Sequence, residues 1–267
     1  MNPVRSIVGL VLALFSLAAS ADSAEIFRAH GSGTLGIDTQ GRVTEVNFDK
    51  SFGDAVDAPL INKIKAWRFE PIVEDGRAVA AIAHFNLALQ AELANSASDA
   101  LKIVDVAFVD PPGQSKPLFK NIQAPKYPRR QLQNGFGAEV IVRVETDAQG
   151  KVLNVAAEGG WLTGPPTLES RQTKAFEDFV SASIKAVSVW DFTGVASAEH
   201  RSFSLPIRFA IERDSPWSRA HFVERAPEPW MLIADGVEVT ALLEGGQARN
   251  AQIKLLSDLN QEALSTN

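Results

Sequence analysis

The side chains that most often carry out catalysis form no recognisable set in this sequence. The chain has no cysteine, which excludes thiolate metal sites and cysteine nucleophiles. Its four histidines lie far apart and show no metal-ligand spacing. The sequence contains no G-x-S-x-G nucleophile elbow, no H-E-x-x-H zinc motif and no phosphate-binding glycine loop. We therefore expect no catalytic residue, no metal site and no cofactor, and we expect a protein that is not an enzyme.

Two pairs of acidic residues are the remaining candidates for general acid and base chemistry. Glu177 and Asp178 fall in one predicted helix, and Asp54 and Asp57 fall at the start of another. Acidic side chains are common on solvated helix faces and stabilise helix N-termini through the helix dipole. We favour these structural roles. A deep polar pocket with a buried carboxylate would instead favour an enzyme.

The composition is that of a globular protein of one or two domains. The chain has 267 residues, of which 45% are hydrophobic and 22% are charged. A formal net charge of −6 argues against a nucleic-acid partner, because such proteins present a basic face. The sequence therefore gives no support to a nucleic-acid partner.

Residues 1–21 have the features of a secretory signal peptide. Arg5 supplies a positive charge, residues 7–19 are mainly apolar, and Ala19-Ser20-Ala21 forms an A-x-A cleavage site. The apolar stretch is shorter than the roughly 20 residues that a membrane-spanning helix needs. We expect cleavage and export to the periplasm. The alternative is that the segment stays uncleaved and anchors the protein in the inner membrane.

A short pattern occurs twice in the chain. Gln40-Gly41-Arg42-Val43 returns as Gln149-Gly150-Lys151-Val152, and an apolar run lies on each side of both copies. Glycine supplies the positive φ that a tight turn needs. Both copies are therefore predicted to be β-hairpins.

The residues after each hairpin also correspond. An amphipathic segment follows in both cases and leads to a Trp-x-Phe motif, at Trp67 and Phe69 and again at Trp190 and Phe192. An alternating strand then closes each unit. The order strand, turn, strand, helix, Trp-x-Phe, strand predicts an α+β fold with two units, each a three-stranded antiparallel sheet with a helix packed on one face.

These patterns divide the chain into five parts. A signal peptide (1–21) precedes a first unit (25–90), a linker with a possible strand (91–119), a second unit (120–212) and a C-terminal extension (213–267). The extension has no predicted role. Ile253, Leu256 and Leu259 fall on one face of a predicted final helix over 248–264.

The second unit resembles the C-terminal domain of TonB-family energy transducers. The matching features are the leader Pro125-Lys126-Tyr127-Pro128, Gly137 before the first strand, the hairpin turn from Asp147 to Val152, and the Trp190-x-Phe192 motif. The first unit resembles this domain in part: its 65–71 segment, KAWRFEP, matches the end motif closely, but it has no P-x-Y-P leader.

The resemblance implies recognition of a partner peptide by strand addition. TonB C-terminal domains bind an extended segment of an outer-membrane receptor at an exposed sheet edge, where main-chain hydrogen bonds supply affinity. By analogy the edge is the last strand, 204–211, which contains Pro206. The partner-binding residues are then expected to be Gln123, Pro125, Tyr127, Arg201, Ser204, Arg208 and Phe209.

For several of these residues a structural reading is favoured. Tyr127 is expected to be a core aromatic with a hydrogen-bonded hydroxyl, and Trp67 and Trp190 to be core residues. Arg201 and Arg208 are expected to be ordinary solvated charges, although either could hold an acidic group of a receptor peptide.

The transducer function itself needs a membrane anchor and a long proline-rich arm. Only Pro3 precedes residue 59, so the arm is missing from this sequence. We therefore expect a periplasmic TonB-like protein that binds a TonB-dependent receptor or a transducer component. The alternative is a membrane-anchored transducer that supports transport across the outer membrane. A further possibility is a structural role, in which sheet edges pair with each other within one chain or in a homodimer and leave no edge free.

Overall fold

The computed structural model describes most of the chain between Glu25 and Leu232. The described residues are 25–93, 100–111, 122–193, 202–211 and 215–232, with 243–244, 247–248, 253–257, 259 and 264–265. The predicted signal peptide and Arg201 lie outside them. Within these ranges, no helix is long and apolar enough to cross a membrane.

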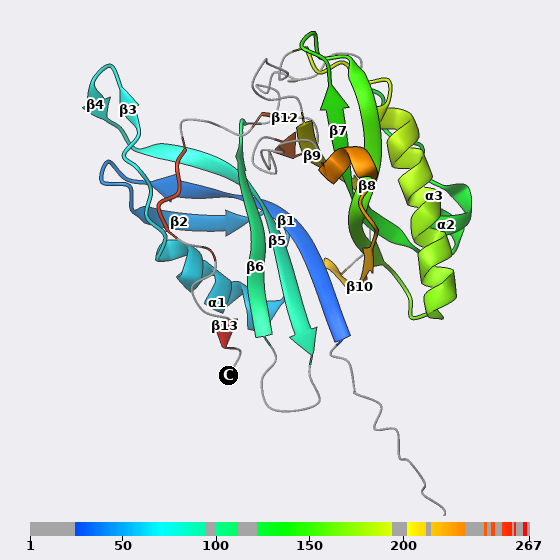
Figure 1. Ribbon diagram of the computed structural model, residues 1–267. Helices are drawn as coiled ribbons and strands as arrows, with labels where there is room; N and C mark the ends of the chain where they lie inside the picture. The colour runs from blue at the N-terminus through cyan, green and yellow to red at the C-terminus, as the bar shows by residue number, and fades with distance from the viewer. Residues whose placement is uncertain are drawn as a thin grey trace, which may run out of the picture.

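The fold is mixed α+β, as predicted, and is built on one large antiparallel sheet (Figure 1). Its nine strands run in the order β13-β6-β5-β1-β10-β8-β7-β9, with β2 beside β1. Two short two-stranded sheets, β3 (Val73–Glu74) with β4 (Arg77–Ala78) and β11 (Leu243–Glu244) with β12 (Gln247–Ala248), are separate from it in hydrogen bonding, although β11 lies near β9.

The N-terminal half of the sheet is organised around β1. A hairpin joins β1 to β2, a helix follows, and β5 returns to pair along the whole of β1. The bounds are β1 (Glu25–Ile37), β2 (Val43–Phe48), α1 (Asp54–Lys65) and β5 (Ala81–Leu93). Leu60 and Ile64 of α1 are fully buried in a core that includes Leu35 and Phe85. The helix therefore covers one face of these strands.

The C-terminal half repeats this order around β7. A hairpin joins β7 to β8, a helix follows, and β9 returns to pair with β7. The bounds are α2 (Arg129–Gln133), β7 (Gly137–Thr146), β8 (Val152–Thr163), α3 (Glu169–Val187) and β9 (Ser202–Phe209). Phe176 and Phe179 of α3 are fully buried against Val140 and Phe209.

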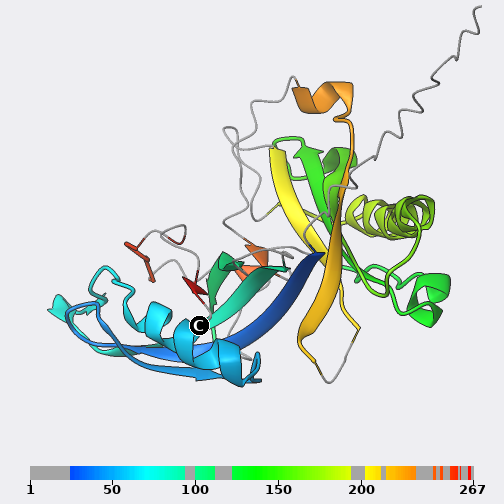
Figure 2. The same ribbon diagram turned by 90° about the horizontal axis from the view of Figure 1, so that it is seen from below.

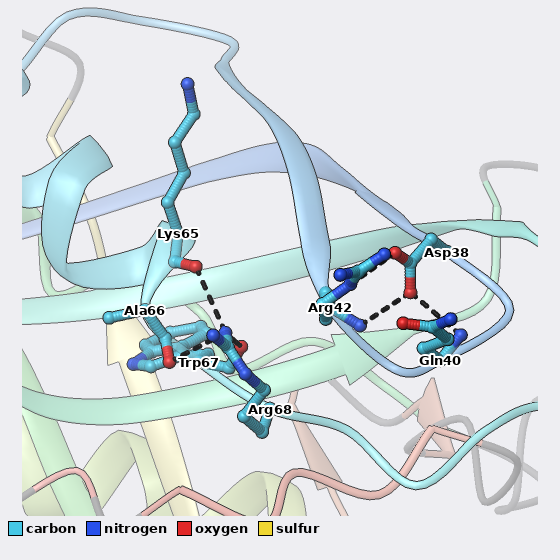
Figure 3. A network of polar contacts seen from close by, with 7 residues as sticks. All are labelled: Asp38, Gln40, Arg42, Lys65, Ala66, Trp67 and Arg68. Atoms are coloured by element: carbon cyan, nitrogen blue, oxygen red, sulfur yellow. Dashed lines mark hydrogen bonds and ion pairs between the residues drawn. The ribbon is translucent and has the colours of Figure 1, made fainter.

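The first hairpin turn is fixed by its aspartate. One carboxylate oxygen of Asp38 accepts hydrogen bonds from the backbone N–H groups of Gln40 (2.8 Å) and Arg42 (2.9 Å) (Figure 3). The Phe69 N–H donates to the Gly41 carbonyl at 2.8 Å, so the Trp-x-Phe segment lies directly against the turn.

The second turn is held in the same way. Asp147 accepts hydrogen bonds from the N–H groups of Gln149 and Lys151, both at 2.9 Å. The Phe192 N–H donates to the Gly150 carbonyl at 3.0 Å. The repeated Asp-x-Gln-Gly sequence therefore corresponds to a repeated contact between a turn and a Trp-x-Phe segment.

A strand of the C-terminal extension joins the two halves. The first part of β10 (Trp217–Glu224) pairs with β1, and its second part pairs with the end of β8. Figure 2 shows β1 and β10 between the two helices, with α1 and α3 on different sides of the molecule. The sheet is thus continuous, in contrast to the two separate three-stranded sheets expected from the sequence. The two halves do not pair with each other directly, because β10 lies between them.

The linker and the chain end complete the N-terminal half. The linker contains β6 (Ala100–Val109), which pairs with β5, and β13 (Leu264–Ser265) pairs with β6. The expectation of a helix over 248–264 was wrong for residues 253–257. Here the Glu70 N–H donates to the Lys254 carbonyl and the Leu256 N–H donates to the Arg68 carbonyl. Strand-like pairing with the Trp-x-Phe segment replaces local helix formation.

Candidate functional site

The strand β9 is the last strand of the sheet at its C-terminal half. Among the described strands it pairs with β7 alone, so its other side is an edge. Pro206 lies opposite Ile141 in this pairing. A proline ring has no N–H to donate to a ladder, so the nitrogen of Pro206 must face away from β7. Because backbone groups alternate along a strand, the N–H groups of Ser204 and Arg208 face the same outer edge.

The leader before α2 is held in place at both of its ends. The Trp190 indole N–H donates to the Gln123 carbonyl at 3.0 Å. Farther along, the Tyr127 ring packs edge-on against Phe179 and Phe209, with ring centroids 5.6 Å apart in each case. The Tyr127 hydroxyl donates to the Phe136 carbonyl at 2.7 Å. These contacts make Tyr127 a structural aromatic, as expected, and they place the Tyr127 end of the leader beside the end of β9.

The other expected partner-binding residues differ in accessibility. Arg208 is exposed, Pro125 is half-buried, and the Gln123 side chain is exposed. Ser204 and Phe209 are buried. The Ser204 hydroxyl donates to Glu158 at 2.8 Å, and Phe209 belongs to the core under α3. Ser204 and Phe209 can therefore offer a partner their backbone groups but little of their side chains.

The acid pairs considered from the sequence have structural partners. Asp57 accepts hydrogen bonds from the Phe52 N–H (2.8 Å) and the Ser51 hydroxyl (2.6 Å) at the start of α1. Asp178 accepts a hydrogen bond from Gln131 at 2.7 Å. Glu177 forms an ion pair with Arg225. The structure brings neither pair together at a pocket in the described residues.

A pocket of about 330 Å³ lies where the two halves of the sheet meet. We call it the seam pocket. It is lined by charged side chains, by apolar side chains and by hydroxyl groups from five strands and their connections. The lining residues that matter below are Arg28, His30, Glu139, Trp161, Arg208 and Phe209.

The carboxylate of Glu139 is the centre of this pocket. Its two oxygens contact Arg28 Nη1 at 3.3 Å and His30 Nε2 at 3.2 Å. Burial alone would raise the pKa of Glu139, but the hydrogen bond from His30 and the nearby charges of Arg28 and Arg208 more than offset it. The net result is a pKa of about 2.

The buried carboxylate is the feature that would favour an enzyme, so its pKa matters. A general acid or base works best with a pKa near the working pH. Glu139 stays ionised far below neutrality and is held by an arginine and a histidine. This environment favours a fixed ion cluster that ties β1 to β7, and it gives no support to proton transfer.

Sequence reasoning missed Arg28, His30 and Glu139. Their only signal is weak: Glu139 alternates with the inward-facing Ala138 and Val140 of β7 and so falls on the face opposite α3. Nothing in the sequence spacing places Arg28 beside it, because the two residues are 111 positions apart.

Within the described ranges, no group of three or more His, Asp or Glu side chains is arranged to hold a metal ion. Comparison of the chain with family models, with curated proteins and with solved structures found no match.

Proposed function

We propose that this chain is a periplasmic TonB-like protein that binds extended peptide segments by strand addition at β9. Its partner is a TonB-dependent outer-membrane receptor or a component of a transducer complex. The observation that carries the proposal is the position of β9, which ends the sheet and pairs only with β7 in the described part of the chain. An incoming strand can hydrogen-bond to such an edge.

The proposal treats each half of the sheet as one TonB-C-terminal-like unit. Three features support this assignment: the shared strand order, the helix that covers each half, and the matching contact between turn and Trp-x-Phe segment. In the first half the strand that corresponds to β9 is β5, and β5 pairs on its other side with β6. Only in the second half does the corresponding strand, β9, end the sheet that the structure describes. The second half is therefore the peptide-binding unit.

The alternative is a membrane-anchored transducer of the same family. The two proposals differ in the fate of residues 1–21, so the mass of the protein recovered from the source cells separates them. Loss of residues 1–21 supports a secreted binding protein. Retention of these residues supports the anchored form.

Amide hydrogen exchange gives a direct test of strand addition. The probes are synthetic peptides that cover the periplasmic N-terminal segments of TonB-dependent receptors from the same organism. We expect a binding peptide to slow exchange of the Ser204 and Arg208 amides by about tenfold or more, because these amides face the outer edge. The Leu205 and Ile207 amides face β7 and should change little. Protection of neither outer amide by any binding peptide would contradict strand addition at β9.

A matched pair of variants tests the same edge by affinity. Arg208→Pro removes both the side chain and the outward N–H, whereas Arg208→Ala removes the side chain alone. The strand conformation of Ile207 is compatible with a following proline. We expect Arg208→Pro to bind the peptide about five- to tenfold more weakly than Arg208→Ala, measured by calorimetry. Equal affinity of the two variants would exclude a hydrogen bond from this amide.

A further inference from the structure

The seam pocket contains a buried arginine whose hydrogen-bonding capacity is only partly used. Arg28 is 7% exposed, and its guanidinium lies 4.7 Å from the centre of the Trp161 ring. One of its terminal nitrogens contacts Glu139, but its Nε has no partner in the described residues. Buried N–H groups of an arginine are normally all paired, because leaving one unpaired is costly. Arg28 therefore carries an N–H group that no described residue satisfies.

The neighbouring histidine shows the same feature. His30 Nε2 contacts Glu139, whereas its Nδ1 is buried and has no partner within the described ranges. Arg28 and His30 both come from β1 and both line the seam pocket. Two unpaired nitrogens thus belong to one pocket, on adjacent outward positions of one strand.

The charge of the seam pocket is positive although the chain is acidic. Among the described residues, Arg28 and Arg208 line it beside the one carboxylate of Glu139. Arg208, Glu139 and Trp161 are direct neighbours across β9, β7 and β8, so one arginine lies at each side of Glu139. A positive excess of this kind in a concave site attracts an anion.

The remaining lining indicates what the anion is attached to. The apolar side chains at the pocket include those of Trp161, Ile211 and Pro216. A volume of about 330 Å³ suits a small organic molecule or the last residue of a peptide. Glu139 would repel a doubly charged phosphate more strongly than a singly charged group, and a planar guanidinium matches a carboxylate.

We propose that the seam pocket binds a carboxylate group attached to an apolar body, with Arg28 and Arg208 as its donors and His30 as a neighbouring residue of the pocket wall. The carboxylate has two possible sources, a free organic acid or the C-terminus of a peptide. The proposal is independent of strand addition, because it depends on the face of the sheet opposite α3 and needs no hydrogen bond at the outer edge of β9.

Calorimetry with four probes tests the proposal on the purified protein. Benzoate is compared with the neutral benzamide, and a pentapeptide that ends in a free C-terminal phenylalanine is compared with its C-terminal amide. We expect at least one carboxylate to bind about tenfold or more tightly than its neutral counterpart. Preference for benzoate assigns the site to organic acids, and preference for the free peptide alone assigns it to chain ends. Equal binding or no binding by both pairs overturns the proposal.

Two variants with the same charge change locate the binding. Arg208→Gln removes a pocket cation, whereas Arg130→Gln removes an exposed arginine of α2 outside the seam pocket. We expect about a tenfold loss of carboxylate affinity for Arg208→Gln and an unchanged affinity for Arg130→Gln. In nitrogen-15 NMR of the unaltered protein, the His30 side-chain resonances should shift on binding. Equal effects of the two variants, or an unshifted His30, would show that the carboxylate binds elsewhere.

Discussion

Replacement of Gly41 by alanine should lower the free energy of unfolding by about 3–5 kcal/mol, several times the effect of the same change at Gly76. Both glycines have a φ of 76°, so the backbone strain of an alanine is shared by the two variants. The difference lies in their surroundings. A Cβ on Gly41 would lie 2.0 Å from the Phe69 carbonyl oxygen, whereas a Cβ on Gly76 would have no atom within 4 Å.

Urea unfolding of the two variants measures this difference. Gly76→Ala should cost about 1–2 kcal/mol, which is the cost of the positive φ alone. Gly150→Ala should resemble Gly41→Ala, because its Cβ would lie 2.3 Å from the Thr193 nitrogen. If Gly41→Ala and Gly76→Ala cost the same, the close approach of turn and Trp-x-Phe segment does not constrain the fold.

Replacement of Glu139 by glutamine should destabilise the protein by about 3 kcal/mol at pH 7. The change leaves Arg28 buried without its carboxylate partner and weakens the hydrogen bond with His30. Because Glu139 joins β7 to β1, the loss of stability should be greatest where the two halves of the sheet meet. Amides of β10, which pairs with both halves, should then exchange faster in native-state hydrogen exchange.

The effect of Glu139→Gln should depend on pH in a defined direction. The pKa of Glu139 is about 2 in the folded protein, below its ordinary value of 4.5. A lowered pKa means that the ionised group stabilises the folded state above pH 4.5, and that this contribution is lost as the pH falls from 4.5 towards 2. The difference in unfolding free energy between the unaltered protein and Glu139→Gln should therefore shrink over this range.

Glu92→Gln provides the matched control for this prediction. Glu92 also lies on a strand and pairs with a lysine, Lys102, at 3.1 Å, but the Lys102 side chain is exposed and the Glu92 side chain is 33% exposed, about twice as much as that of Glu139. Exposed pairs contribute little, so its replacement should change the unfolding free energy by less than about 1 kcal/mol. A similar cost for Glu92→Gln and Glu139→Gln would show that the seam cluster contributes no more than a surface ion pair.

The sequence by itself determined the local elements of this fold. The Asp-x-Gln-Gly turns, the amphipathic helix before Trp190 and the alternation along β7 depend on neighbouring residues and on periodicity, which a sequence displays directly. The mixed α+β class follows from them. The expectation that the last strand forms an edge came from the resemblance to TonB C-terminal domains, and Pro206 in that strand is compatible with it; among the described strands β9 does end the sheet.

Only the tertiary structure decided how these elements combine. β10 pairs with β1, although the two strands lie near opposite ends of the described sequence. No local pattern in Trp217–Glu224 distinguishes that pairing from others. The seam pocket follows from the same pairing, since it brings Arg28 to Glu139. Residues 254–256 likewise pair with residues 68–70, where the sequence predicted part of a helix. Local propensities are weak compared with the burial and hydrogen bonds that distant segments supply, and those contacts exist only once the chain has folded.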